Sequence, residues 1–347
     1  MLKALCHEKD KRNIRLRIVL LSTFASIVIL FSFLVGRYAI TLTQLGNILL
    51  SSLGIVPADL PENVATVFYK IRLPRIISAF LAGGGLALAG TVYQGVFRNP
   101  MVSPDILGAT AGAGLGAAIG LLFSFNDLQI QIMSFVFGIL AVALTYSVCL
   151  CVSKRNNMVL TLVLTGMVVS ALFQAGISLI KFTADPYSKL PAITFWLMGS
   201  MASATIKDIG VLLMPLLIGG IPLFLLRWRI NLLAFSDEEA QSMGVNTKRL
   251  RLIVIICSTL ITAAVVSVGG IIGWVGLIIP HLTRIITGPN YKALLPASII
   301  MGGTYLLLVD DLARGMLAME IPLGILTALI GAPFFIYLMY KGRNGWS

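Results

Sequence analysis

Few side chains in this sequence could take part in covalent or metal chemistry. The two histidines, His7 and His281, lie far apart in the chain and cannot by themselves form a zinc site of the usual kind. None of the four cysteines belongs to a CxxC pair, so we predict no disulfide and no metal site. The sequence also contains no Ser/His/Asp set and no GxSxG, HExxH or GxxxxGK[ST] motif. These patterns predict a chain that is not an enzyme and that carries no ATPase of its own.

An acidic cluster, Asp237, Glu238 and Glu239, offers a different kind of chemistry. A helix that begins after Ser236 would place these acids in its first turn, where the helix dipole favours negative charge. Gly244 would end that helix. A short amphipathic helix of this kind is suited to docking into a groove on another subunit. The alternative interpretation is a solvated connecting loop.

The amino-acid composition distinguishes a water-soluble protein from a membrane protein. Hydrophobic residues make up 58% of the 347 residues and charged residues only 12%, about half of the roughly 25% typical of soluble domains. So few charges cannot cover that much apolar surface in water. A soluble enzyme, a nucleic-acid-binding domain and a disordered chain are therefore excluded. The net charge of +12 indicates basic residues retained on the cytoplasmic side of a membrane.

Apolar segments of spanning length predict an all-α polytopic membrane protein with about ten transmembrane helices. A basic tail over residues 1–17 precedes the first segment, and residues 1–347 are expected to form a single transmembrane domain with no inserted soluble domain. A turn at Gly269 and Gly270 is expected to separate the seventh and eighth segments. The predicted spans are 18–36, 76–97, 106–125, 130–152, 159–180, 209–226, 252–270, 271–287, 293–313 and 321–340.

Lys and Arg residues set the orientation of these spans. With a cytoplasmic N-terminus and ten crossings, 18 of the 26 basic residues fall on the inner side and 8 on the outer side. This asymmetry predicts that both termini are cytoplasmic. A nine-span model would place Lys341 and Arg343 outside and fits less well. The polar segment 227–251, which includes the acidic cluster, then lies in the cytoplasm.

Glycines recur at every fourth position in the third predicted span. Gly108, Gly112, Gly116 and Gly120 would form one smooth helix face that allows close approach of a neighbouring backbone. We interpret this face as helix packing. The alternative is that it lines the path of a transported molecule.

Four motifs occur in an order that resembles one family of membrane proteins. The combination is similar to that of FecCD-type permeases, the membrane subunits of bacterial ABC importers for iron–siderophores, haem and vitamin B12. The resemblance covers about residues 15–343. The motifs are RLPR at 72–75 followed by RNPM at 98–101, DEEAQSMGV at 237–245, GIIGWVGLIIPHLTR at 270–284 and EIPLGILTALIGAPFF at 320–335.

The resemblance implies partners and a location. It implies a homodimer in the cytoplasmic (inner) membrane, with the transport pathway on the two-fold axis. Two ATP-binding subunits would lie below it and a periplasmic or lipid-anchored substrate-binding protein above it. ATP and magnesium would bind to the ATPase subunits, and this chain would bind no cofactor. Membrane lipid is an expected partner and nucleic acid is not.

The resemblance also implies roles for particular residues. Arg72, Arg75 and Arg314 would pair with acidic residues of the binding protein, although snorkelling at the membrane interface is the alternative. The inner gate would lie near Val159 and Leu160, which are apolar here where the B12 importer has small polar side chains. The acidic segment would form the cytoplasmic coupling loop that contacts the ATPase. Its residues are Ser236, Asp237, Glu238, Glu239, Ala240, Met243 and Gly244.

The sequence does not name the cargo. An iron–siderophore complex is the leading expectation, cobalamin or haem are alternatives, and some family members carry oxyanions such as molybdate. An ion-coupled secondary transporter is the alternative from a different class. Such transporters need ionisable groups or broken helices in the middle of the membrane, and the cores of the ten predicted spans carry no charge.

Overall fold

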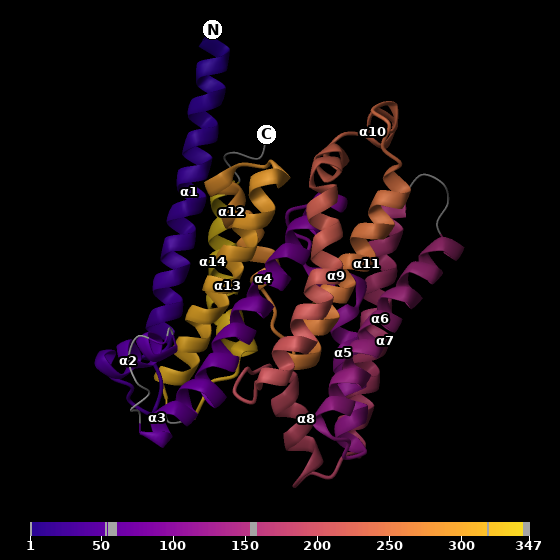
Figure 1. Cartoon of the computed structure of the whole chain (residues 1–347). Helices are drawn as coiled ribbons and strands as arrows, with labels where there is room; N and C mark the ends of the chain where they lie inside the picture. Colours follow the sequence, from indigo (N-terminus) through magenta and orange to yellow (C-terminus); the bar gives the residue numbers. More distant parts are fainter. Residues whose placement is uncertain (1, 53, 55–60, 153–157, 318, 343–347) are drawn as a thin grey trace.

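The protein is a bundle of helices (Figure 1). The structure is a computed structural model that describes residues 2–52, 54, 61–152, 158–317 and 319–342. Every regular element in these ranges is helical, as predicted. The first seven elements are α1 (Leu2–Ser32), α2 (Leu42–Ser52), α3 (Glu62–Thr66), η1 (Val67–Arg72), α4 (Leu73–Val96), η2 (Pro104–Leu107) and α5 (Ala109–Leu122).

The later elements include most of the long helices. They are α6 (Asp127–Val152), α7 (Met158–Thr183), α8 (Lys189–Leu197), α9 (Ile206–Asn231), η3 (Leu232–Ala234), α10 (Asp237–Ser242), α11 (Thr247–Gly269), α12 (Val275–Thr287), α13 (Tyr291–Gly315) and α14 (Leu323–Gly342).

Eight helical segments in the described residues are long and apolar enough to cross a membrane, and two further apolar helices are shorter. The shorter ones, α5 and α12, correspond to the predicted spans 106–125 and 271–287. With 14 and 13 residues they are only about 20 Å long, against a hydrocarbon thickness of about 30 Å. These two predicted spans are therefore too long, because each helix is preceded by a segment of different geometry.

Glycines in the left-handed region mark both of these interruptions. Gly108 has a φ of +88° and joins η2 to α5. Gly270 has a φ of +68° and ends α11, but the expected tight turn into the next helix is absent. Instead, the chain runs without helical structure until α12 begins at Val275. The end of α11 is held by the loop after α8, where the backbone N–H of Ser200 donates to the carbonyl of Gly269 over 2.8 Å.

The start of α1, the end of α14 and the helix α10 all lie at one end of the bundle (Figure 1). We call this the α10 end. Helices α2, α3 and α8 lie at the opposite end, which we call the α8 end. A chain that crosses a membrane an even number of times has both of its ends on the same side. The position of both ends at the α10 end therefore agrees with the ten-span prediction. The assignment of this side to the cytoplasm stays a prediction that rests on the basic residues. Three of these, Lys154, Arg155 and Arg343, lie outside the described residues.

Glycines bring the central helices into backbone contact. Helix α4 packs against α9, α11, α12 and α13. A Cβ atom built on Gly83 would lie 2.3 Å from the carbonyl oxygen of Gly302 in α13, and one on Gly90 would lie 1.9 Å from that of Gly276 in α12. No side chain fits between backbones this close, so the positions require glycine.

The glycine series of the third span contacts α6. A Cβ atom on Gly112 would lie 2.4 Å from the carbonyl oxygen of Phe137, and one on Gly116 would lie 2.3 Å from that of Met133. Gly120 also faces α6. Gly108 departs from the prediction because it precedes α5 and faces α7 at Ser170, so it is not part of the helix face.

We predict that Gly116→Ala destabilises the protein by about 1–3 kcal/mol, because the added methyl group forces α5 and α6 apart. The matched control is Gly210→Ala in α9, where a Cβ atom meets nothing within 4 Å. This control should be neutral or stabilising by up to about 1 kcal/mol, since alanine favours a helix over glycine. Thermal unfolding in detergent, followed by tryptophan fluorescence, measures both. Equal midpoints for the two variants would show that the close contact is not required.

Candidate functional site

The N-terminus of α10 is fixed by a capping box. The hydroxyl oxygen of Ser236 accepts a hydrogen bond from the backbone N–H of Glu239 over 3.2 Å, and the backbone N–H of Ser236 donates to the Glu239 carboxylate over 2.8 Å. These two bonds satisfy donors that a helix start leaves free. The pKa of the Glu239 carboxyl group is lowered, because its ionised form accepts hydrogen bonds from both the backbone N–H and the hydroxyl of Ser236.

The C-terminus of α10 is a Schellman motif. The backbone N–H of Val245 donates to the carbonyl of Ala240 over 3.0 Å, and that of Gly244 donates to the carbonyl of Gln241 over 2.9 Å. Gly244 has a φ of +81°. Because a side chain is disfavoured at this φ, glycine ends the helix here. The start and end of α10 thus lie where the sequence placed them.

Asp237 attaches α10 to two long helices. Its carboxylate accepts hydrogen bonds of 2.6 and 2.9 Å from Arg251 of α11 and one of 2.9 Å from Arg98, which follows α4. Partial burial acts to raise the pKa of Asp237, but the bonds and charge of Arg251, together with Arg98, outweigh it and lower the pKa. Arg98 also donates to the carbonyl of Leu233 over 2.7 Å. The six-residue helix is therefore held rigidly against the bundle.

The two faces of α10 differ in exposure. Ala240 and Val245 are buried against the rest of the chain, whereas Glu238, Met243 and Gly244 are exposed. Ala240 is 0% exposed and cannot contact a separate subunit. Its coupling role stays a prediction, and the structure gives Ala240 an internal packing role, because the apolar side of so short a helix packs against its own chain.

Charged residues are buried together at the α8 end. Both oxygens of Asp310 in α13 accept from Nε of Arg75 in α4 over 3.0 Å, and Arg75 also donates to Glu320 over 3.0 Å. Arg314 forms ion pairs with Asp310 and Asp311. Asp310 is fully buried. We call this set of residues, together with Arg72, the outer ion network, because the predicted topology places it on the outer side of the membrane.

The outer ion network also caps the C-terminus of α1. Arg72 donates to the carbonyls of Phe33 and Tyr38. Arg314 donates to the carbonyl of Ser32 over 3.3 Å, and the hydroxyl of Ser32 donates to Asp311 over 2.5 Å. The last carbonyls of a helix lack partners within the helix and carry partial negative charge, so arginine suits this position.

The three arginines predicted to contact a binding protein are buried within the chain. Arg72, Arg75 and Arg314 are 3%, 5% and 6% exposed. A direct ion pair with another protein would require the exchange of bonds that now hold α1, α4 and α13 together. Their direct docking role stays a prediction, and the structure gives them an internal role.

Comparison with known proteins decides the family. The model of the FecCD transport family matches residues 24–341. The chain belongs to the FecCD transport family. It is thus a multi-pass membrane permease of the ABC importer type and not a catalytic enzyme, and such permeases work with ATPase subunits and a substrate-binding protein.

Relatives of this FecCD permease differ in the cargo that their names state. The molybdate import system permease protein of Haemophilus influenzae is 42% identical over 311 residues, which cover 90% of this chain and 91% of the relative. A probable iron chelatin transport system permease protein of Helicobacter pylori is 42% identical over 285 residues, covering 82% and 85%.

A solved structure confirms the permease fold. It is described as a metal-chelate type ABC transporter in an inward-facing conformation. It aligns with a TM-score of 0.84 at 39% identity and covers 93% of this chain and 98% of the solved one.

The predicted gate residues lie in the first turn of α7. Leu160 is exposed, while Val159 is partly buried against the core that also contains Leu162. Residues 153–157, directly before this helix, lie outside the described residues. The gate function stays a prediction.

Sequence reasoning missed several partners of the permease's candidate functional residues. Arg98 and Arg251 were not assigned to the coupling element although they hold Asp237, and Glu320 was not assigned to Arg75. The available signal was charge in apolar surroundings: Arg75 and Glu320 each adjoin a predicted span and need a counter-ion.

We predict that Asp237→Asn releases α10 from the permease, because Arg98 and the nearly buried Arg251 lose their counter-ion. Hydrogen exchange of the 237–245 amides should accelerate by about tenfold, the effect of losing a charge-assisted hydrogen bond. Glu238→Gln, which changes an exposed neighbouring acid, is the matched control and should leave exchange unchanged. Equal exchange in both variants would contradict the anchoring role of Asp237.

The same ion pairs predict that α10 loses protection from hydrogen exchange at low pH. The pKa of Asp237 is lowered on folding. Its contribution to the stability of the folded α10 is therefore complete above the pKa of the unfolded state, about 3.9, and is lost as the pH falls through the lower pKa of the folded state. Protection of α10 should therefore be constant from about pH 7 to 5 and decline below about pH 4. In Asp237→Asn the decline should be smaller.

Proposed function

We propose that this FecCD permease forms a homodimer that moves a metal complex across the membrane, driven by two separate ATP-binding subunits. The single observation that carries the proposal is α10, a preformed acidic helix at one end of a bundle of long apolar helices. The ATPase subunits would bind at the α10 end. The substrate-binding protein would bind at the α8 end.

Rigidity supports α10 as the coupling element. Force from an ATPase can pass through a surface helix only if that helix moves together with the helices behind it. The caps at Ser236 and Gly244 prevent fraying, and Asp237 connects α10 to α11 and to the end of α4. The exposed residues Glu238 and Met243 supply a polar and an apolar contact for the partner.

The outer ion network supports docking in an indirect way. Arg72 and Arg314 hold the end of α1, and Arg75 joins α4 to α13. The surface presented to a binding protein at the α8 end therefore has a fixed shape. In this proposal the three arginines position the docking surface, and exposed residues around them make the contacts.

An iron chelate is the proposed cargo, with molybdate as the second candidate. The iron chelatin and Fe(3+)-citrate permeases among the relatives support the first, at 42% and 38% identity. The molybdate permease of Haemophilus influenzae supports the second. Cobalamin and haem, named for relatives at 36% and 35% identity, are further alternatives.

Transport by proteoliposomes distinguishes these candidates. The permease would be reconstituted with its ATPase and its binding protein, and uptake of radioactive ferric citrate and of radioactive molybdate would be compared. We expect uptake that vanadate blocks and that a protonophore leaves unchanged. Molybdate uptake without ferric citrate uptake would replace the first cargo by the second. Protonophore-sensitive, ATP-independent uptake would contradict ATP-driven coupling.

We predict that Gly244→Val uncouples the permease. A Cβ atom at Gly244 meets nothing within 4 Å, so the substitution introduces no clash and acts only through the backbone at a φ of +81°. A β-branched residue disfavours this conformation by roughly 1–3 kcal/mol. Membrane insertion should persist, while transport and ATP hydrolysis stimulated by the binding protein should both fall severalfold.

Gly244→Asn is the matched control, since asparagine tolerates the left-handed region. It should retain most of the coupled activity. If Gly244→Val transports at the wild-type rate, or if both variants fail equally, the conformation of α10 is not the coupling feature.

A further inference from the structure

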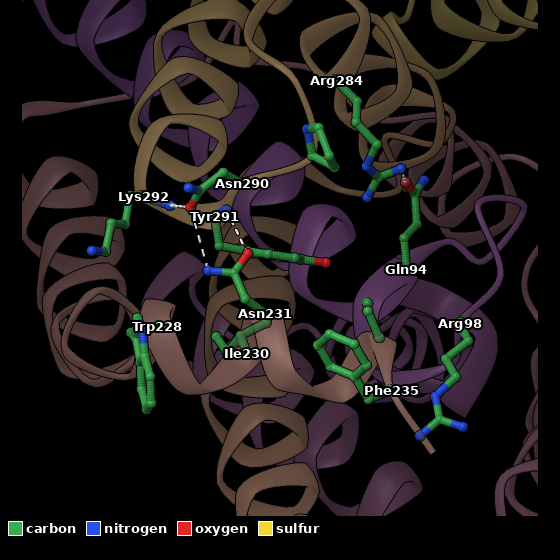
Figure 2. Close-up of a pocket in the computed structure, with 13 residues that line it drawn as sticks. Gln94, Arg98, Trp228, Ile230, Asn231, Phe235, Arg284, Asn290, Tyr291 and Lys292 are labelled. Carbon is green, nitrogen blue, oxygen red and sulfur yellow. Dashed lines mark hydrogen bonds between the residues drawn. The ribbon is translucent and has the colours of Figure 1, made fainter. Parts of the chain in front are cut away.

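A cavity of about 650 Å³ opens at the α10 end. It lies where α4, α9, α12 and α13 begin or end, and Figure 2 shows its lining. Three cations line it, Arg98, Arg284 and Lys292, and its described lining includes no acidic residue. The cavity is therefore a concentration of positive charge at the level where these long helices end.

The wall of the cavity is built by hydrogen bonds between different helices. Arg284 donates to the side-chain oxygen of Gln94 over 2.9 Å, and the Gln94 amide donates to the carbonyl of Leu277 over 3.1 Å. Asn231 donates to Asn290 over 3.3 Å. The guanidinium of Arg284 is thus held in place through a neutral partner, which leaves its charge uncompensated.

Among the described residues, only one of the three cations in the cavity has an acidic partner. Arg98 is paired with Asp237. Within the part of the chain that the structure describes, neither Arg284 nor Lys292 forms an ion pair. The cavity therefore retains two positive charges that an anion could neutralise.

One side of the cavity meets an exposed apolar surface of α9. Exposed apolar residues recur along this helix at Ile218, Ile221, Leu225 and Trp228, which are 58%, 54%, 77% and 54% exposed. This spacing places them on one helix face, which we call the α9 stripe. Trp228 ends the stripe and also lines the cavity, beside Lys292 (Figure 2). Tryptophan at the end of a spanning helix is typical of the membrane–water interface.

We propose that this cavity binds the headgroup of an anionic phospholipid from the leaflet at the α10 end. The phosphate would lie between Arg284 and Lys292, with Asn231 and Asn290 as further polar contacts, and the acyl chains would follow the α9 stripe. Basic pockets between helix ends at the membrane surface are suited to such headgroups. The continuous path from apolar stripe to basic cavity fits a molecule that is apolar at one end and anionic at the other.

The proposed lipid site adjoins the coupling element. The wall opposite Lys292 contains Arg98 and Phe235 (Figure 2), and Arg98 binds Asp237 of α10. A bound headgroup would therefore stabilise the region from which α10 is anchored. The site does not depend on the identity of the cargo.

Native mass spectrometry of the purified permease tests the site. The protein in neutral detergent would be offered equal amounts of phosphatidylglycerol and phosphatidylcholine with the same acyl chains. We expect preferential retention of phosphatidylglycerol. Lys292→Gln, a change of an exposed residue, should weaken this retention by about fivefold, the effect of one basic residue near an anionic lipid surface.

Lys248→Gln is the matched control. Lys248 is exposed at the start of α11 and does not line the cavity, so retention should stay at the wild-type level. Equal losses in both lysine variants would overturn the proposal in favour of unspecific charge attraction. Equal binding of the two lipids by the wild-type protein would overturn it as well.

Two further measurements test whether a free anion or a protein segment, and not a lipid, occupies the cavity. Inorganic phosphate at the same concentration should not displace phosphatidylglycerol, and displacement would assign the cavity to a free anion. Addition of the partner ATPase should leave the lipid bound. Release of the lipid in proportion to bound ATPase would instead assign the cavity to an acidic segment of that protein.

Discussion

The outer ion network is the constraint on which the rest of the bundle depends. Arg72, Arg75, Arg314, Asp310 and Asp311 are buried where little water reaches, and Glu320 joins them from the partly exposed edge of the network. Removal of one member of such a set leaves an uncompensated buried charge, at a cost of about 3–5 kcal/mol. Because its members come from η1, α4, α13 and the segment before α14, and because it caps α1, the network fixes five parts of the chain at once.

Close backbone packing sets the arrangement of the helices between the two ends. Helices in lipid gain no hydrophobic stabilisation from contact with one another, so they depend on van der Waals packing at small residues. Glycine pairs such as Gly83 with Gly302 allow α4 to approach α13 without intervening side chains. The ion network and these contacts act on the same helix pair, which makes α4 and α13 the fixed centre of the permease.

The α10 end is organised on a different principle. Its small helix is held by caps and by Asp237, and its cavity carries more positive charge than the described residues neutralise. The α8 end, in contrast, pairs its buried charges within the chain. This difference agrees with an α10 end that binds an anionic partner, as the proposed lipid site requires.

The sequence by itself determined the features that depend only on neighbouring residues. Apolar length predicted helices that cross a membrane, and Ser236 and Gly244 predicted both ends of α10, because a cap is formed by residues within one helical turn. The ordered motifs indicated the family that the comparison then established. The glycine spacing indicated a packing face, which is observed at Gly112 and Gly116.

Only the tertiary structure decided the features that join distant residues. The partner of Arg75 lies 235 residues away at Asp310, and no local pattern specifies such a pairing. The shortness of α5 and α12 depends on left-handed residues and on loops from elsewhere in the chain. Ala240 faces its own bundle because α10 is anchored through Arg98 and Arg251. The physical reason is common to these cases: local backbone geometry is set within a few residues, whereas burial and the neutralisation of charge are set by whichever segments the fold brings together.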